Sequence, residues 1–409
     1  MKEASRVQAA IEVLNEILAD KHPADNILDK YFKDRRYIGA KDRRFIADLV
    51  WQVIRNRLKL SERLGQTVSA RLLIALKLGD ADLELLFNGE EYAPEKLSSD
   101  ELKLLKNAAN FEDFSEEAIY ECPQWLIKKI NDYKLLDALN NTAPVDMRVN
   151  FTSREKALAR LKKEGLFFAP TPLSPLGIRS HERINLNNCM TYQDGEVEVM
   201  DEGSQLLSLL CRVKPFHKII DYCAGAGGKS LAIGAELNNE GVVWAHDISQ
   251  ERISKIKKRA ERLDVTNIKI IQNVTDKDYD RFILDCPCSG SGTWRRSPDA
   301  KFRLTPQKLS EICLTQAELL EFGAAHTAKD GRLIYMTCSV LAEENEQQIE
   351  QFLKKHPEYT PIDHCELWKN TLDLAIYPFN SDKWLKFSPT TTGTDGFFFC
   401  AMRNNTQSC

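Results

Sequence analysis

From Asp201 onward, short apolar runs alternate with amphipathic stretches of helical length, and this alternation constrains the fold more than any other feature of the chain. Strands that alternate with helices form a parallel sheet with helices on both faces, so we predict an α/β fold. An apolar stretch from Phe397 to Met402 is expected to close the sheet edge. The strands are predicted at residues 218–223, 241–247, 267–272, 281–285 and 331–336, and the helices at 229–237, 250–263 and 309–328.

Two regions of different character precede this sheet. The first is predicted to be helical, because apolar residues recur at helical spacing from Val7 to Leu18 and again from Phe45 to Ile54. The second indicates a small mixed α/β module with a loop punctuated by prolines. Its strand is predicted at 147–151 and its helix at 153–165. Three domains are therefore expected, at residues 1–140, 141–200 and 201–409.

The composition is that of a globular protein, with 43% hydrophobic and 28% charged residues among 409. No apolar run reaches the length of a membrane span and no signal peptide opens the chain, so we expect a cytoplasmic protein without a membrane partner. The eleven cysteines lack the spacing of a disulfide framework or of a zinc site. Reduced thiols and no metal are therefore expected.

The net charge of −4 gives no support for nucleic-acid binding by the protein as a whole. Cations nevertheless crowd one segment of the helical region: Lys33, Arg35, Arg36, Lys41, Arg43, Arg44, Arg55, Arg57 and Lys59. A local basic face can bind phosphates even on an acidic protein. A solvated helix surface would show the same pattern, and the sequence leaves both interpretations open.

A glycine-rich loop follows the first strand, between Asp221 and Ser230. A phosphate-binding P-loop would need glycine at Cys223, and a dinucleotide fingerprint would need it at Ser230. The remaining match is the S-adenosylmethionine loop, an acid followed by alternating glycines, with one glycine replaced by Cys223. Asp247, at the end of the second strand, is placed to bind ribose hydroxyls. The alternative is an ordinary tight turn, with Asp247 as a helix cap.

Two cysteine motifs end the fourth and fifth strands, Asp285-Cys-Pro-Cys288-Ser and Thr337-Cys338-Ser. Carbon 5 of cytosine is a poor nucleophile, but a thiolate that adds to carbon 6 makes it enamine-like, so that it can attack a methyl group. A carboxyl group must meet the ring near N3 as charge builds there. The motifs supply both groups beside the cofactor loop. Cysteines can also pack as small apolar side chains, an alternative that stays open above all for Cys223, Cys286 and Cys313.

These motifs resemble those of the RsmB/NOP/Sun family of RNA cytosine-C5 methyltransferases. The resemblance covers most of the chain and is carried, in order, by segments 223–229, 285–290 with 293–299, 337–339 with 344–346, and 393–397. It implies that Cys338 is the nucleophile, that Cys288 assists product release, that Asp285 meets the cytosine and that Lys229 lies next to the substrate. It further implies that the cofactor, S-adenosylmethionine, is bound by Asp221, Cys223, Ala224, Gly225, Ala226, Gly227, Gly228, Lys229, Asp247, Arg252, Asn273 and Asp285.

The same resemblance implies a class I methyltransferase fold, Rossmann-like with a mostly parallel seven-stranded sheet. It identifies residues 1–140 as similar to the helical NusB-related RNA-binding domain. RNA is the expected partner, ribosomal RNA first and transfer RNA second, for a monomeric enzyme. Asn273 departs from the family, which often has an acid there. Two alternatives remain: a DNA cytosine-C5 methyltransferase, whose nucleophile lies in the earlier motif, and an inactive RNA-binding or ribosome assembly factor.

Overall fold

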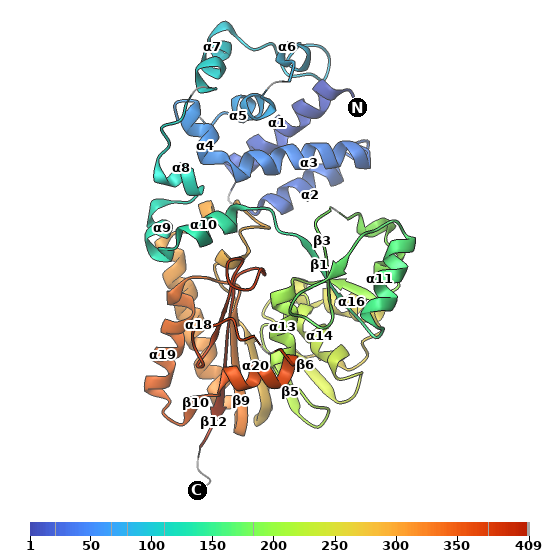
Figure 1. Cartoon of the computed structure of the whole chain (residues 1–409), viewed down its shortest axis with the longest axis vertical. Coiled ribbons are helices and arrows are strands. Elements are labelled where there is room, and N and C mark those ends of the chain that lie inside the picture. The colour runs from blue at the N-terminus through green and yellow to red at the C-terminus, as the bar shows by residue number, and fades with distance from the viewer. Residues whose placement is uncertain are drawn as a thin grey trace. The chain divides into compact units, whose positions relative to one another are not determined.

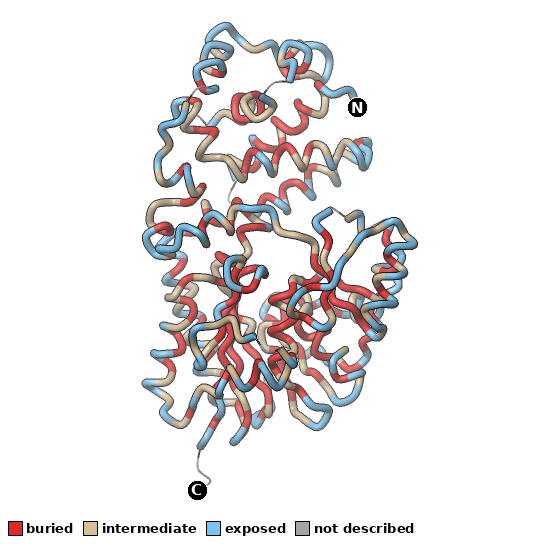
Figure 2. Tube along the Cα trace, viewed as in Figure 1, coloured by how far each residue is buried: buried red, intermediate tan, exposed pale blue. Residues whose placement is uncertain are grey.

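The computed structural model describes residues 1–20, 22–66, 68–79, 81–109, 111–182, 184–374 and 376–406. The chain forms two compact units (Figure 1). One comprises Met1–Asn141 with Trp294–Thr305, and the other Thr142–Thr293 with Pro306–Cys409. Buried residues lie in the interior of each unit (Figure 2). Within these described ranges, no helix is long and apolar enough to cross a membrane.

The first unit is helical, with a core that α1, α3 and α5 share through residues such as Val7, Ile46 and Leu73. Its helices are α1 (Glu3–Ala19), α2 (Ala24–Asp34), α3 (Ala40–Arg55), α4 (Arg57–Arg63), α5 (Ala70–Leu78), α6 (Leu83–Leu86), α7 (Ser99–Ala108), α8 (Glu116–Tyr120), α9 (Gln124–Ile130), α10 (Tyr133–Asn140) and α17 (Ala300–Arg303). Helix α7 begins with a capping box formed by Ser98 and Glu101.

We expected residues 294–305 inside the third domain, but in the structure they belong to the helical unit. The Arg55 guanidinium donates to the Arg295 carbonyl at 2.9 Å and to the Asn140 carbonyl at 2.7 Å. The ammonium group of Lys301, only 1% exposed, donates to the Asn140 side chain at 2.8 Å. These contacts join segments far apart in sequence, and local periodicity could not have revealed them.

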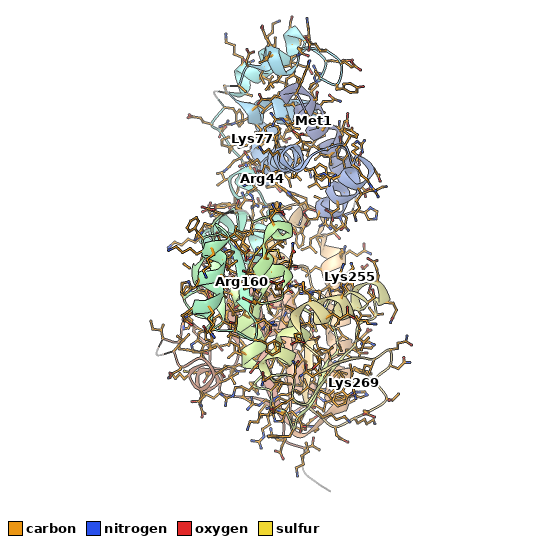
Figure 3. All side chains as sticks on the ribbon, turned by 90° about the vertical axis from the view of Figure 1, so that its right-hand side faces the viewer. Met1, Arg44, Lys77, Arg160, Lys255 and Lys269 are labelled. Atoms are coloured by element: carbon orange, nitrogen blue, oxygen red, sulfur yellow. The ribbon has the colours of Figure 1, made fainter. Side chains whose placement is uncertain are left out.

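The second unit begins with a small antiparallel sheet in the order β2-β3-β1-β4. Its elements are β1 (Val145–Val149), α11 (Arg154–Lys163), β2 (Ala169–Pro170), β3 (Gly177–Ser180), α12 (Met190–Gln193) and β4 (Val197–Val199). The strand expected at 147–151 ends two residues earlier, because Phe151 has a positive φ of 48°. Of the stretch expected to be a loop, from Pro170 to Pro175, only Pro170 lies in a strand, β2, and β3 follows that stretch. Arg160 of α11, which is labelled in Figure 3, forms ion pairs with Asp194 and Glu196.

The main sheet has the strand order β10-β12-β9-β8-β5-β6-β7, with the short β11 paired to β12. Strands β9, β8, β5, β6 and β7 are parallel, whereas β10, β11 and β12 are antiparallel to their neighbours. The strands are β5 (Lys218–Asp221), β6 (Val242–Ala245), β7 (Ile268–Ile270), β8 (Tyr279–Asp285), β9 (Thr327–Thr337), β10 (Tyr359–Pro361), β11 (Leu385–Phe387) and β12 (Phe397–Asn404). This mostly parallel sheet confirms the predicted class I methyltransferase fold.

One strand position was predicted wrongly. The stretch from Phe397 to Met402 does not close the sheet, because β12 lies between β9 and β10, and β10 forms the edge. Every residue of that stretch is buried, so the strand is covered on both faces and paired along both sides.

Helices cover both faces of the sheet. On one face, Ile219 and Ile283 pack with residues of α13, α14 and α20; on the other, Phe282 and Tyr335 pack with residues of α18 and α19. The helices of this unit are α13 (Glu202–Leu210), α14 (Gly228–Glu236), α15 (Gln250–Ile253), α16 (Lys255–Leu263), α18 (Pro306–His326), α19 (Glu346–Lys355) and α20 (His364–Leu372). The helix expected at 250–263 is thus divided, and the one expected to reach residue 328 ends at His326, because Thr327 begins β9.

The strand order places the motifs together. The chain runs from β5 outward through β6 and β7, then returns to the other side of β5 through β8 and β9. Such a reversal opens a crevice at the carboxyl ends of the strands, where ligands of α/β sheets bind. The glycine loop leaves β5 there, and the two cysteine motifs leave β8 and β9 at the same edge.

Candidate active site

The loop between β5 and α14 has a backbone that requires its glycines. Gly225 and Gly227 have φ values of +55° and +82°. A Cβ on Gly225 would lie 2.3 Å from a guanidinium nitrogen of Arg252, and one on Gly227 would lie 2.7 Å from Ile256. A Cβ on Gly228 would meet nothing within 4 Å. The loop is therefore packed against α15 and α16 on one side and open at the start of α14.

Asp247 holds this loop in place. Its buried carboxylate accepts hydrogen bonds from the Gly225 amide at 2.7 Å and from the Ser249 amide at 2.8 Å. The Arg252 guanidinium lies 3.7 Å from the same carboxylate. Ile248, the next residue, is 94% exposed. An apolar side chain so open beside a nucleotide-type loop is suited to pack on a ligand ring, and no sequence motif pointed to it.

Asp221 is buried with one acceptor unused. Its Oδ2 accepts a hydrogen bond from the Ser230 hydroxyl at 2.6 Å, while Oδ1 has no partner among the described residues. Burial raises the pKa of Asp221 to about 7. A buried acceptor without a donor is costly unless a ligand supplies one. The ammonium group of an amino-acid-like cofactor would do so, and therefore the residues present fit S-adenosylmethionine.

Of the other predicted cofactor residues, those in the loop lie together, whereas Asn273 lies apart from them beyond β7. The Ala224 amide donates to the His246 carbonyl at 2.8 Å, which ties the loop to the end of β6. Cys223 is mostly buried, and burial raises the pKa of its thiol. Asn273 lies beyond the end of β7 with an exposed side chain. No three His, Cys, Asp or Glu side chains in the described part of the chain are grouped to hold a metal ion.

The two motif cysteines meet. The Sγ atoms of Cys288 and Cys338 lie 3.2 Å apart, although 50 residues separate them in the chain. Both side chains are half-buried. The hydrogen bond with Cys338, together with burial, raises the pKa of Cys288 well above its ordinary value. Cys288 is thus a protonated thiol that can donate to the sulfur of Cys338. Cys286, by contrast, is fully packed in the core, as its alternative interpretation allowed.

An ion pair completes the site. The Lys229 ammonium group donates to Asp285 Oδ2 at 2.6 Å; the Lys229 side chain is 8% exposed and that of Asp285 is 32% exposed. Burial alone would lower the pKa of Lys229, but the charge of Asp285 outweighs it, so the pKa is raised. Lys229 also lies 5.9 Å from the ring centre of Phe397, which belongs to the fourth motif segment. Lysine 229 therefore stays charged and orients the Asp285 carboxylate.

One important residue was missed as a site residue. Glu344 stood in the motif at 344–346, but no role was assigned to it. In the structure its buried carboxylate contacts the serines that follow both cysteines. The signal available in the sequence was an acid six residues after Cys338, which by itself does not point to this contact.

Comparison with known proteins agrees with this geometry. A family model described as 16S rRNA methyltransferase RsmB/F matches residues 209–403. The chain is 30% identical over 324 residues to ribosomal RNA small subunit methyltransferase B of Yersinia pseudotuberculosis, covering 76% of this chain and 72% of the relative. It is 30% identical over 298 residues to the probable ribosomal RNA small subunit methyltransferase B of Bacillus subtilis, covering 69% and 66%. The crystal structure of PH0851 has the same fold, with a TM-score of 0.77, 22% identity and 98% of each chain covered.

The fold, with its glycine loop and paired acids at the sheet edge, defines a class I methyltransferase. Within that class, the chain belongs to the RsmB/F methyltransferase family. The family resemblance inferred from the motifs is therefore confirmed.

Proposed function

We propose that this protein methylates carbon 5 of a cytosine in RNA, ribosomal RNA first, through a covalent bond between Cys338 and carbon 6. One observation carries the proposal: two thiols 3.2 Å apart lie at the ends of adjacent strands, next to an acid held by a lysine. Simple methyl transfer to a nitrogen or oxygen needs no thiol. The relatives' names, which speak of ribosomal RNA, support RNA as the substrate class.

In the proposed reaction, Cys338 Sγ adds as a thiolate to carbon 6, and the electrons of the 5,6 double bond make carbon 5 nucleophilic. Asp285, oriented by Lys229, meets the ring at N3 and the exocyclic amine, where charge builds. Once Cys338 is bonded to carbon 6, its sulfur is no longer the anionic partner whose hydrogen bond raises the pKa of Cys288, so Cys288 can release its own proton to water. The Cys288 thiolate then takes the proton from carbon 5. The electrons of that C–H bond restore the double bond, and the Sγ–C6 bond breaks to release Cys338.

S-adenosylmethionine, when bound, supplies the electrophilic methyl group. Asp221 and Asp247 are the residues that would hold it, the first at its ammonium group and the second at its ribose hydroxyls. Ile248 would pack against its base. Replacement of Asp247 by alanine removes both the ribose contact and the Gly225 anchor, so binding should weaken by about 1–3 kcal/mol. Calorimetric titration with the cofactor measures this, and unchanged affinity would remove Asp247 from the site.

The helical unit is proposed to bind RNA as a NusB-like domain. Four cations of the basic segment have exposed side chains there: Lys33, Arg36, Lys41 and Arg44. Arg44 is labelled on α3 in Figure 3. Exposed cations can neutralise phosphates without giving up an internal contact.

Transfer of a labelled methyl group tests the proposal directly. The purified protein should label ribosomal RNA and leave DNA of the same sequence unlabelled. Bisulfite sequencing of RNA from cells with and without the gene should then locate the modified cytosine. Labelling of DNA alone would favour the DNA enzyme, and labelling of neither would favour an inactive assembly factor.

A further inference from the structure

Glu344 has no part in the mechanism above, yet its carboxylate connects both cysteine loops. It ends a short 3-10 helix (Ala342–Glu344) after β9 and is completely buried. Oε1 accepts hydrogen bonds from the Ser289 amide at 2.8 Å and from Gln316 at 3.1 Å. Oε2 accepts from the hydroxyls of Ser289 and Ser339, each at 2.5 Å. Four donors thus converge on one buried carboxylate.

The serines bound by Glu344 are the residues that directly follow the two cysteines. Ser289 follows Cys288 on the loop after β8, and Ser339 follows Cys338 on the loop after β9. Hydrogen bonds to a carboxylate are short and strong, particularly where water is excluded. This carboxylate therefore links the residues that directly follow the two cysteines.

Other contacts also join the two loops, but those among the described residues are made by neutral groups. The Ser291 hydroxyl lies 2.9 Å from that of Ser339, and the Gly292 amide donates to the Cys338 carbonyl at 2.9 Å. Asn345 donates to the Ser339 carbonyl at 2.9 Å. These bonds are neutral, so Glu344 is the strongest single link between the loops that the described residues provide.

We propose that Glu344 is a positioning residue that holds Cys288 and Cys338 in contact, so that the nucleophile and the group that releases it act on one cytosine. The proposal rests on the roles proposed for the two cysteines. Proton removal at carbon 5 and bond formation at carbon 6 need both sulfurs within reach of adjacent ring atoms. The negative charge of Glu344 also contributes to the raised pKa of Cys288.

Glu344→Gln tests the catalytic side, because it keeps the shape but removes the charge and some acceptor capacity. We expect kcat to fall by about 10- to 100-fold, as for a reacting group displaced by about 1 Å. The KM for RNA and the affinity for S-adenosylmethionine should stay as in the wild type, which also shows that the variant folds. Glu346→Gln is the matched control: that acid forms an ion pair with Lys386 at 2.8 Å, and its replacement should leave kcat unchanged.

Disulfide formation measures the positioning without any catalysis. Treatment of the wild-type protein with diamide should link Cys288 to Cys338 rapidly, because the sulfurs already touch, and mass spectrometry of the joined peptides identifies the bond. Disulfide rates are compared per thiolate, from the pH dependence of each variant, because loss of the Glu344 charge lowers the pKa of Cys288 and by itself speeds the reaction. On that basis Glu344→Gln should form this bond severalfold more slowly, and Glu346→Gln at the wild-type rate. Ser339→Ala, which removes one donor and keeps the charge, should slow it less.

The outcomes separate this proposal from the proposed function. An unchanged disulfide rate in Glu344→Gln, whatever its kcat, overturns the positioning role. A slowed disulfide rate together with full methylation by Cys338→Ala would leave Glu344 as the link between the loops but refute the covalent mechanism. Ser289→Ala combined with Glu344→Gln should lose little more than Glu344→Gln alone, since both act on the same contact. Fully additive losses in kcat would count against the proposal.

Discussion

The cysteine motifs at the carboxyl ends of β8 and β9 and the basic segment of the helical unit were both candidate functional regions in the sequence. In the structure their side chains are arranged differently. At the strand ends, two direct contacts form the site: the sulfur of Cys288 touches that of Cys338, and Lys229 donates to Asp285. In the basic segment, several cations are engaged inside their own unit. Arg43 donates to the Ile38 carbonyl, Arg55 to carbonyls of Asn140 and Arg295, and the Arg35 and Arg57 guanidinium groups lie over Tyr31 and Phe302.

This difference shows how much a motif at a strand end, and how much a cluster of cations, reveals about function. A motif that ends a buried strand has its position fixed by the strand, so its chemistry can be inferred from its sequence. A crowd of cations has no such constraint, because a long cationic side chain can turn to solvent, to a carbonyl or to an aromatic ring. Charge density alone therefore overstates the phosphate-binding surface.

The largest effect should come from separating the two cysteines. Cys338→Ala should abolish methylation and form no covalent adduct, because no thiolate remains to activate the ring. Cys288→Ala should still form the adduct and transfer the methyl group, but release should stall. The protein–RNA species should then survive denaturing electrophoresis.

The reverse result, a trapped adduct with Cys338→Ala and none with Cys288→Ala, would move the nucleophile to the end of β8. That is the arrangement inferred for the DNA enzymes, and the choice of RNA would lose its main sequence support. Cys286→Ala is the control, since the Cys286 side chain is buried among apolar residues of the core. Full activity of both variants would show that the cysteines only pack.

A second prediction concerns pH and the buried acid of the cofactor loop. The pKa of Asp221 is raised to about 7 by burial, so the folded protein keeps a proton that the unfolded chain releases above its ordinary pKa. The contribution of Asp221 to stability therefore falls as pH rises from about 4 to 7. Asp221→Asn should gain stability relative to the wild type over that window, on the order of a few kcal/mol at pH 8. Urea unfolding at pH 5 and pH 8 measures it, and an equal difference at both values would refute the shifted titration.

A third prediction concerns the helical unit itself. The buried Glu121 carboxylate accepts hydrogen bonds from the amides of Leu58 and Lys59 at 2.8 and 2.9 Å, at the start of α4. Glu121→Ala leaves those amides without their acceptor, so the unfolding free energy should fall by about 1–3 kcal/mol. Glu84→Ala, which removes an exposed acid, should have little effect in the same denaturation experiment. Equal stability of the two variants would mean that water replaces Glu121.

The smallest effect should come from the exposed cations. Charge reversal at Arg36 and Arg44 should weaken RNA binding severalfold and lower its salt dependence, because fewer phosphates are neutralised. Cofactor affinity should not change. Reversal at Arg43 and Arg55 should instead lower stability, because those side chains hold backbone carbonyls. RNA-binding titrations at several salt concentrations distinguish a phosphate-binding face from a solvated one. If charge reversal leaves the slope of log affinity against log salt concentration unchanged, the face is a solvated one.

The sequence by itself determined the elements and the chemistry of the sheet. Alternating apolar and amphipathic stretches are local properties, and they gave the parallel strands β5, β6, β7, β8 and β9 to within a few residues. The motifs Asp285–Cys288 and Thr337–Ser339 are local as well, and each was expected at a strand end, where the structure places it. Glycines that need positive φ were likewise visible in the sequence, because only glycine adopts that conformation at low cost.

Only the tertiary structure decided which of these local pieces touch. The contact of Cys288 with Cys338 depends on β8 and β9 being neighbours, and the carboxylate of Glu344 reaches both loops for the same reason. The place of β12 inside the sheet and of residues 294–305 in the helical unit also depends on partners far away in the chain. The periodicity of apolar residues and the spacing of motifs report on single helices, strands and turns. Pairing between distant segments is set by packing of the whole unit.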